Sequence, residues 1–254
     1  MLKPHSHPNL LLPQSPQLPE SFNLLVWNLQ KTPVEQLTTA HLHSYLPVLT
    51  HTPIHLYAFQ EAKLSNPAIA YFDLPYFMSS NIQSQRHHYG VLTASAYQMA
   101  DAERLLTQKR ELGLLTHKSA LLTTHPLNNG QTLYLLNLHA MIFVPYFFIK
   151  KELQRITHLL KQIPESAPLI VSGDFNTWSQ KRNQLLHDTL TSLNLQAVPF
   201  ENAQYIKSIH HHLLDHIYYR HIELTHAQAY AVPQCSDHNP LIAQFSTLKE
   251  INPK

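Results

Sequence analysis

The segment Pro168-Leu169-Ile170-Val171-Ser172-Gly173-Asp174-Phe175-Asn176-Thr177 places a short apolar run directly before an acid and an amide. The apolar residues at 168–172 predict a buried strand, because the run is short and turn-forming residues follow it. Gly173 and Asp174 begin a polar turn, and Ser179 is a suitable cap for a helix that runs to Leu193. A strand, a polar turn and a helix in this order indicate an α/β domain.

The same arrangement, an apolar strand bordered by an acid, an amide or a histidine, recurs along the chain. Further strands are predicted at residues 22–27, 55–60, 90–94, 119–123, 131–138, 216–219 and 241–245, with a hairpin turn at Asn128-Asn129-Gly130. The polar residues at or beside the strand ends are Asn28, Glu61, His139, Asp174, Asn176, Asp215, Asp237 and His238. Because an unpartnered buried carboxylate is costly, we expect these residues to bind metal, to pair or to cap.

Each of these residues has a simple structural explanation when it is taken alone. Asp174 can be a turn residue after Gly173, Glu61 can cap a helix, and Asp215 can pair with a nearby histidine. Together they form a set of oxygen ligands with two histidines, which suits Mg²⁺ or Mn²⁺. A structural zinc site does not fit, because Cys235 is the only cysteine.

Helical patterns lie between several of the predicted strands. Thr32-Pro33-Val34-Glu35 is a helix start with a capping box, and apolar residues continue on one face to Leu46. Residues 151–163 have apolar side chains at helical spacing. No internal repeat or linker divides the chain, so we expect one domain with stacked sheets. Residues 1–20 contain five prolines and predict a flexible leader, not a signal peptide.

The composition limits the class of protein. The chain has 254 residues, 44% of them hydrophobic, and the richest apolar stretch, residues 141–149, is too short to cross a membrane. One cysteine permits no internal disulfide, which fits a reducing, cytoplasmic location. The formal charge of +2 disfavours binding of nucleic acid by charge alone, and most of the 20 histidines are expected to be solvated at the surface.

Several basic and aromatic groups lie close to these motifs. The basic residues Arg86, His87, His88, Lys109, Arg110 and Lys118 could line a phosphate groove, although solvated basic loops are the simpler interpretation. Lys181 and Arg182 lie just past the Asp174-Phe175-Asn176 motif, and a role at the site and a charged helix face explain them equally well. His210-His211-His212 is interpreted as a surface run or a substrate contact. Residues 141–148 are interpreted as helix core, with an exposed patch for a lipid substrate as the alternative.

Seven short motifs, in order across residues 22–245, resemble those of the endonuclease/exonuclease/phosphatase superfamily. They are Trp27-Asn28-Leu29-Gln30, Phe59-Gln60-Glu61, Tyr89-Gly90-Val91, Asn137-Leu138-His139, Ser172-Gly173-Asp174-Phe175-Asn176-Thr177, Leu214-Asp215-His216-Ile217-Tyr218 and Ser236-Asp237-His238-Asn239-Pro240-Leu241. The Asn-x-His motif is similar to that of the pancreatic deoxyribonuclease-like and neutral sphingomyelinase-like branches. The chain as a whole looks close to the small, poorly characterised bacterial branch.

The resemblance implies a fold and a set of site residues. The fold is a four-layer α/β/β/α sandwich of two packed mixed β-sheets, which we expect as a single catalytic domain at residues 21–248 with a tail at 249–254. Glu61 would be the main metal ligand, helped by Asn28 and Asp237. Asp174 and Asn176 would position or deprotonate the attacking water and contact the phosphate. His238, oriented by Asp215, would donate to a phosphate oxygen or act as an acid/base group. His139 would bind the phosphate or protonate the leaving oxygen.

The predicted activity is hydrolysis of a phosphodiester with Mg²⁺, or Mn²⁺ in its place, and with no organic cofactor. Imidazolium groups and a metal ion can neutralise the charge that develops on a phosphate in the transition state. A nuclease is the first interpretation, with a phosphatase or phosphodiesterase acting on a lipid or small-molecule phosphoester as the alternative. A catalytically inert binding module with the same fold is the alternative of another class. We expect a monomer.

Overall fold

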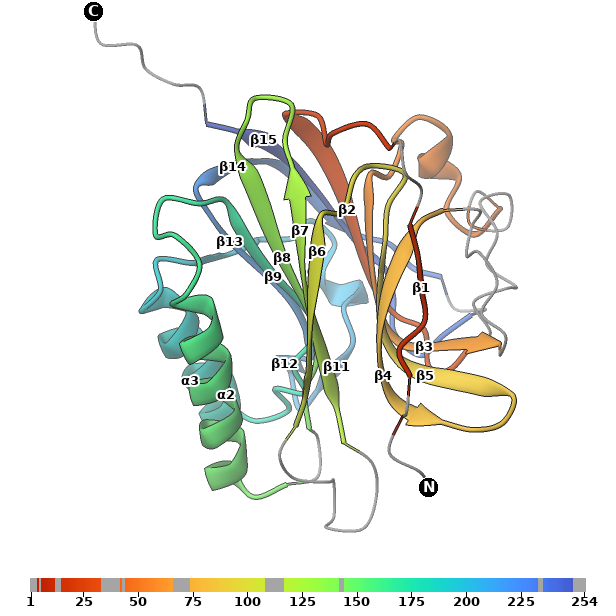
Figure 1. Ribbon diagram of the computed structural model, residues 1–254. Coiled ribbons are helices and arrows are strands. Elements are labelled where there is room, and N and C mark those ends of the chain that lie inside the picture. The colour runs from red at the N-terminus through yellow and green to blue at the C-terminus, as the bar shows by residue number, and fades with distance from the viewer. Residues whose placement is uncertain are drawn as a thin grey trace, which may run out of the picture.

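The computed structural model describes residues 4, 6–11, 15–32, 42, 44–65, 74–107, 117–141, 144–232 and 235–248. These residues form two large mixed β-sheets that pack face to face, and two helices lie on the outer face of one of them (Figure 1). The prediction of two packed mixed sheets in an α/β sandwich is therefore confirmed. No helix in the described part of the chain is long and apolar enough to span a membrane.

The first sheet has seven strands in the order β1-β4-β5-β3-β2-β15-β14. Its central strands β2 and β3 are parallel, and its other pairs are antiparallel. In this spatial order the strands are β1 Asn9–Leu10, β4 Tyr76–Gln83, β5 His87–Ala94, β3 Leu56–Ser65, β2 Ser21–Asn28, β15 Leu241–Thr247 and β14 Ile222–Ala229.

The second sheet has six strands in the order β10-β13-β9-β8-β7-β6. Here β8 and β9 are the parallel pair at the centre. The strands are β10 Gln196–Ala197, β13 Asp215–Arg220, β9 Leu169–Asp174, β8 Thr132–His139, β7 Ser119–Pro126 and β6 Asp101–Leu106. A small hairpin of β11 (Ser208–Ile209) and β12 (His212–Leu213) precedes β13.

Helices α2 (Tyr146–Leu160) and α3 (Gln180–Thr191) cover the outer face of the second sheet (Figure 1). Each follows one of the two parallel strands: α2 comes after β8, and α3 comes after β9. Short 3₁₀ helices lie at Pro47–Thr50 and Ala203–Tyr205. The chain therefore enters both helices from the same end of the second sheet, and the loops at that end stand side by side.

Alternating side chains of the central strands fill separate apolar layers. Val26 and Ile170 lie in the core between the two sheets, whereas Val171, one residue along β9, packs against the helices. Trp27 faces the outer side of the first sheet, where Leu42 and Leu46 cover it. A strand buried on both faces is apolar at nearly every position, which explains the continuous apolar runs of the sequence.

The structure also corrects some boundaries. Helix α2 begins at Tyr146, five positions before the predicted start at residue 151. Strands β4, β6 and β14 were not predicted; β6 and β14 are edge strands with exposed charged residues such as Glu103 and Glu223. Most of the helix predicted after Thr32, and the tail at 249–254, lie outside the described residues.

Part of the predicted flexible leader packs on the domain. Asn9 and Leu10 pair with β4. Leu18 is fully buried in the core between the sheets, and its backbone bonds to Pro126 and Asn128. The domain boundary at residue 21 stays a prediction, but these contacts place Leu18 inside the folded unit.

Candidate active site

The predicted polar residues meet because of the register of the central strands. In the second sheet, His139 at the end of β8 lies beside Asp174 at the end of β9, and Asp174 lies beside Asp215 at the start of β13. In the first sheet, Asn28 at the end of β2 lies beside Gln60 on β3. Contacts of Glu61 and Asn28 with residues of the second sheet show that these ends face one another.

Asp174 is the most connected side chain of the group, and only 2% of it is exposed. Its Oδ2 accepts a hydrogen bond from Asn28 Nδ2 at 2.9 Å, and its Oδ1 accepts one from the Asn176 backbone at 3.0 Å. The Nε2 atoms of His139 and His238 lie 3.5 and 3.9 Å from Oδ2. Burial and the negative charge of Asp215 raise the pKa of Asp174 above its usual range, against the opposing effect of His238.

Asp215 and His238 form a buried pair behind Asp174. His238 Nδ1 lies 2.8 Å from Asp215 Oδ2, while Asp215 Oδ1 is buried without a hydrogen-bond partner. Burial alone would lower the pKa of His238, but the charge and hydrogen bond of Asp215, with the charges of Asp174 and Asp237, raise it to about 9. His238 is therefore an imidazolium at neutral pH. Trp27 Nε1 donates to the His238 carbonyl at 2.8 Å and fixes this loop to β2.

Glu61 reaches the site from a bulge in β3. The pairing of β3 with β5 shifts register between Phe59 and Ala62, and Glu61 has a left-handed backbone with φ of 49°. A bulge redirects a side chain at the rim of a sheet. Here it brings the Glu61 carboxylate to 3.8 Å from His139 Nε2.

His139 and Lys118 form a contact that sequence reasoning did not foresee. The Lys118 ammonium lies 2.9 Å from His139 Nε2 and 3.9 Å from Glu61 Oε1, and the residue is buried directly before β7. Burial and the nearby positive charges, Lys118 first, hold the pKa of His139 well below its usual range. His139 is therefore neutral, and the positive charge on this side of the site belongs to Lys118. The signal available in the sequence was a lysine directly before an apolar strand.

Asp237 lies at the edge of the group. Its side chain is 46% exposed and its carboxylate pairs with Lys207 Nζ at 2.9 Å, while its other oxygen is 4.0 Å from His238 Nε2. Asn28, the other predicted helper ligand, is buried, and its Oδ1 accepts a hydrogen bond from the Gln30 backbone at 3.0 Å. Of the three predicted metal ligands, Glu61 and Asn28 contact the buried group directly and Asp237 borders it.

The donor set fits a divalent cation. Ligand atoms of Asp174, Asp215 and His238 lie within 4.8 Å of one another, and all three side chains are buried. A protonated histidine cannot bind a metal ion, so the carboxylates of Asp174 and Asp215 are the possible ligands in this cluster. Two buried carboxylates this close repel each other, and one carboxylate oxygen of Asp215 has no partner. Added positive charge would relieve both conditions, and oxygen ligands favour Mg²⁺ or Mn²⁺.

The other candidate residues divide between the surface and the core. Lys181 stands over the Tyr146 ring at 4.3 Å, and His210 and His211 lie in the turn between β11 and β12. Of the two interpretations of Arg182, the charged helix face is wrong, because the residue is 6% exposed. Lys109, Arg110 and Phe143 lie outside the described residues.

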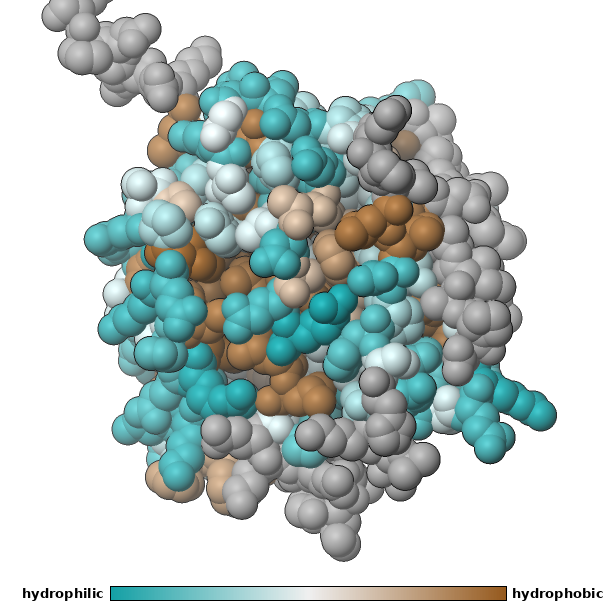
Figure 2. Space-filling view, in the orientation of Figure 1, coloured by the Kyte–Doolittle hydropathy of each residue, from teal (hydrophilic) through white to brown (hydrophobic). Residues whose placement is uncertain are grey.

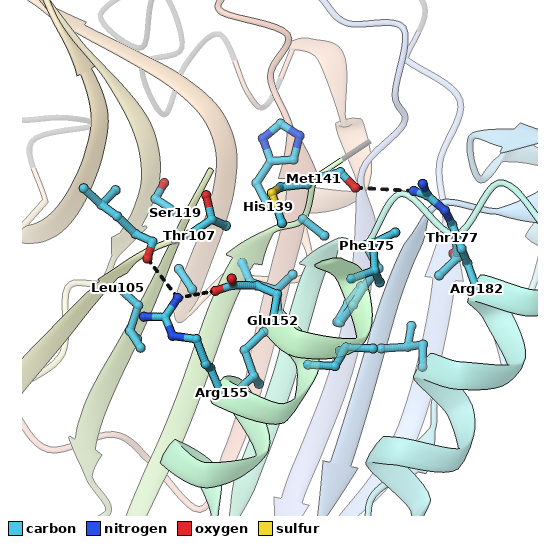
Figure 3. Close-up of a pocket in the computed structure, with 18 residues that line it drawn as sticks. Leu105, Thr107, Ser119, His139, Met141, Glu152, Arg155, Phe175, Thr177 and Arg182 are labelled. Carbon is cyan, nitrogen blue, oxygen red and sulfur yellow. Dashed lines mark hydrogen bonds and ion pairs between the residues drawn. The ribbon is translucent and has the colours of Figure 1, made fainter. Parts of the chain in front are cut away.

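A mainly apolar cavity lies next to the site, beneath α2. Its lining includes Leu105, Met141 and Phe175, with His139 and Arg182 at its border (Figure 3). On the face in Figure 2, hydrophobic side chains gather in a recess between α2 and β6, within a largely hydrophilic surface. Phe147 on α2 is 58% exposed, so residues 141–148 are not wholly helix core as predicted.

Comparisons with known proteins agree with this geometry. A model described as the Endonuclease/Exonuclease/phosphatase family matches residues 21–238. A UPF0294 protein of Vibrio cholerae is 38% identical over 132 residues, which are 52% of this chain and 46% of that protein. A UPF0294 protein of Vibrio vulnificus is 39% identical over 132 residues, 51% of this chain and 45% of that protein. The matched region is thus less than half the length of these relatives.

Solved structures share the fold at low sequence identity. An endonuclease/exonuclease/phosphatase family protein from Leptotrichia buccalis has a TM-score of 0.62 at 14% identity, over 89% of this chain and 99% of that one. The human Nocturnin catalytic domain with bound sulfate has a TM-score of 0.61 at 17% identity, over 95% and 98%. The D. rerio TDP2 complex with a single-strand DNA product has a TM-score of 0.61 at 16% identity, over 89% and 99%.

Proposed function

The chain belongs to the endonuclease/exonuclease/phosphatase family, and we propose that it is a divalent-metal-dependent phosphodiester hydrolase of the nuclease type. The observation that supports this proposal best is the buried Asp174, which accepts from Asn28 and lies between two histidines, with Asp215 behind one of them. Family membership supports hydrolysis of phosphoester bonds in general. The nucleic-acid substrate rests on the TDP2 neighbour, whose structure holds a single-strand DNA product.

Glu61, Asn28 and Asp237 would hold the metal ion, Mg²⁺ or Mn²⁺, beside the buried carboxylates of Asp174 and Asp215, whose mutual repulsion the ion would relieve. When bound, the ion would supply positive charge that stabilises the developing phosphate oxyanion. Asp174 would accept the proton of the attacking water, a role that suits a carboxylate whose pKa is raised toward neutrality. Asn176, whose backbone bonds to Asp174, would contact the phosphate beside it.

Two positive groups of the chain lie near Asp174: His238 directly, and Lys118 through His139. His238, kept protonated by Asp215, would donate a hydrogen bond to a phosphate oxygen. His139 is neutral and accepts from Lys118. We therefore assign the positive charge near the leaving oxygen to Lys118, with His139 as the polar group between Lys118 and Asp174.

The first test is hydrolysis of a panel of phosphoesters with Mg²⁺ or Mn²⁺ by the purified full chain. The panel contains supercoiled plasmid, single-stranded DNA and RNA oligonucleotides, a sphingophospholipid and an inositol phosphate. We expect cleavage of nucleic acid that stops in excess EDTA. Asp174→Asn and His238→Ala should lower kcat/KM by about 10²–10⁴ because each removes a proton-transfer or charge-stabilising group.

Asp101→Asn is the matched control, because Asp101 is an exposed carboxylate on the edge strand β6 and lies outside the site. Wild-type rates in Asp174→Asn with an unchanged melting curve would contradict the assigned role. Full activity in EDTA would contradict metal dependence. Cleavage of only the lipid or the inositol phosphate would support a phosphoester hydrolase and contradict the proposal that the protein is a nuclease. No turnover and no calorimetric binding of Mg²⁺ would favour the inert binding module.

A further inference from the structure

Arg182, in the first turn of α3, bonds to backbone of the two loops that border the candidate site. Its Nη2 donates to the Val144 carbonyl at 2.8 Å, and its Nη1 lies 3.4 Å from the carbonyls of Met141 and Asn176. Figure 3 shows the side chain leaving α3 toward Met141. The Trp178 ring covers the guanidinium, with 4.4 Å between Cζ and the ring centroid. Arg182 thus joins the loop after β8 to the loop after β9.

The position of this arginine is unfavourable for the helix that contains it. A positive charge at the N-terminus of a helix opposes the helix dipole, and the first turn of α3 has no acidic residue. Burial lowers the pKa of Arg182 to about 10, so the group stays charged at neutral pH. In the part of the chain that the structure describes, no carboxylate lies within ion-pair distance of it. Among the described residues, the three carbonyls and the Trp178 ring are the partners that offset these costs.

The two loops that Arg182 joins hold the polar groups around Asp174. Asn176 Nδ2 donates to the Ala140 carbonyl at 2.8 Å, and the Ala140 backbone donates to the Asp174 carbonyl at 2.8 Å. Asn176 also has a left-handed backbone with φ of 51°. Such a conformation persists when the surrounding contacts hold it, and Arg182 binds the carbonyl of this residue.

We propose that Arg182 is a positioning residue for the hydrolysis: it fixes Asn176 and the segment after His139 in the arrangement that the reaction needs. The inference rests on the proposed function. Arg182 is buried behind the loops and acts through Asn176 and His139. Its loss should therefore lower the rate of the chemical step and leave substrate binding nearly unchanged.

Arg220 provides a matched control. It is likewise 6% exposed and donates to two backbone carbonyls, Leu193 at 3.0 Å and Pro164 at 3.2 Å. It ends β13 beside Leu169, at the opposite end of β9 from Asp174. Arg220→Met therefore removes the same kind of interaction without touching the site loops.

The experiment compares Arg182→Met, Arg182→Lys and Arg220→Met at a temperature well below every Tm. We expect Arg182→Met to lower kcat about 10- to 100-fold, since a small misplacement of site groups is enough for such a loss. KM should stay within about twofold of wild type. Arg182→Lys should recover only part of the rate. The ammonium keeps the positive charge, but it cannot reach three carbonyls as the guanidinium fork does. Arg220→Met should lower Tm and keep kcat.

Hydrogen exchange by NMR is the second measurement and does not need turnover. The amides of Ala140 and Asn176, both bonded to Asp174, should exchange at least about tenfold faster in Arg182→Met. In Arg220→Met the amide of Leu195, close to Leu193, should exchange faster, and the amides of Ala140 and Asn176 should not.

Several results would overturn the proposal. One is that Arg182→Met keeps the wild-type kcat or changes KM alone. Another is that Arg220→Met loses as much kcat as Arg182→Met when both lose the same Tm. The third is that the amides of Ala140 and Asn176 exchange at the wild-type rate in Arg182→Met. A wild-type protein that hydrolyses no phosphoester would reject the proposed function, and the exchange rates would then decide whether Arg182 orders the two loops.

Discussion

The buried histidines differ in charge according to the groups beside them. His238 pairs with Asp215, and its pKa rises to about 9. His139 lies against Lys118 and has a lowered pKa. His125, on β7 in the interior, has a pKa lowered by burial to about 3, and its Nδ1 has no partner. The same side chain is therefore a fixed cation at one position and a neutral acceptor or core group at the others.

His125 should make the fold less stable in mild acid. Its unfolded-state pKa is near 6.5, so below that pH the unfolded chain takes up a proton that the native chain refuses until about pH 3. The contribution of neutral His125 to the unfolding free energy is thus fully present above pH 6.5, and it is lost as the pH falls toward 3. Between pH 7 and 5 this group accounts for about 2 kcal/mol of lost unfolding free energy.

Urea unfolding of wild type and His125→Leu at pH 7 and pH 5 measures this contribution. The leucine variant should lose about 2 kcal/mol less than wild type over that interval. His238 has the opposite sign, because its raised pKa adds stability that disappears as the pH rises through about 9. Equal losses in the two proteins would show that His125 is protonated, or hydrated, in the native state.

At single residues, the sequence predicted the acids and histidines of the site but not their basic neighbours. Glu61, His139, Asp174, Asp215 and His238 could be found because each borders an apolar strand. A surface position was the favoured interpretation of Lys118 and one of two equal interpretations of Arg182. Lysine and arginine are usually solvated, and sequence alone does not reveal a backbone that accepts their hydrogen bonds. Both proved to be buried next to the site.

Among the elements, the strands that border the site depend on local backbone exceptions. Gly173 pairs with Leu138 in the parallel ladder of β8 and β9 and has a φ of +135°. A Cβ atom added there would lie 2.0 Å from the Leu138 carbonyl oxygen. Only glycine therefore allows β8 and β9 to approach closely enough to place His139 beside Asp174.

Gly173→Ala should lower the unfolding free energy by about 3 kcal/mol or more, because a disfavoured backbone conformation combines with a steric clash. The control is Gly130→Ala in the β7–β8 turn, where φ is +85° but no atom lies within 4 Å of the added Cβ. That change should cost about 1 kcal/mol, from the backbone alone. Equal costs in urea unfolding would show that the sheet moves apart freely at Gly173.

Elements with a continuous apolar run were the easiest to predict from sequence. β8 and β9 are buried on both faces over most of their length, and residues 133–136 and 169–171 are unbroken apolar runs. β14 alternates buried and exposed residues at the sheet edge, and its polar residues Thr225, His226 and Gln228 hide the pattern. The bulge at Glu61 had no sequence signal, because a left-handed glutamate is stabilised by tertiary contacts.

At the scale of the molecule, the site exists only when the two sheets are correctly aligned. A buried polar contact crosses the apolar layer between them: Asn137 on β8 accepts from Gln60 Nε2 at 2.7 Å. Its Nδ2 donates to the carbonyls of Phe59 at 3.1 Å and Leu92 at 3.0 Å. Gln60 directly precedes Glu61, and Asn137 lies two residues before His139. The contact therefore fixes one sheet against the other next to the site.

Asn137→Leu tests this alignment, because leucine keeps the volume and removes the hydrogen bonds. We expect a loss of about 2–4 kcal/mol in unfolding free energy, since Gln60 loses a buried partner. The added substitution Gln60→Leu should restore part of that stability, because the Gln60 amide that lost its Asn137 partner is then removed as well. Activity should not return, because apolar packing does not fix the alignment of one sheet against the other as directional hydrogen bonds do. Glu61 would then no longer be held opposite His139. A double variant that regains both stability and wild-type turnover would show that shape alone aligns the sheets.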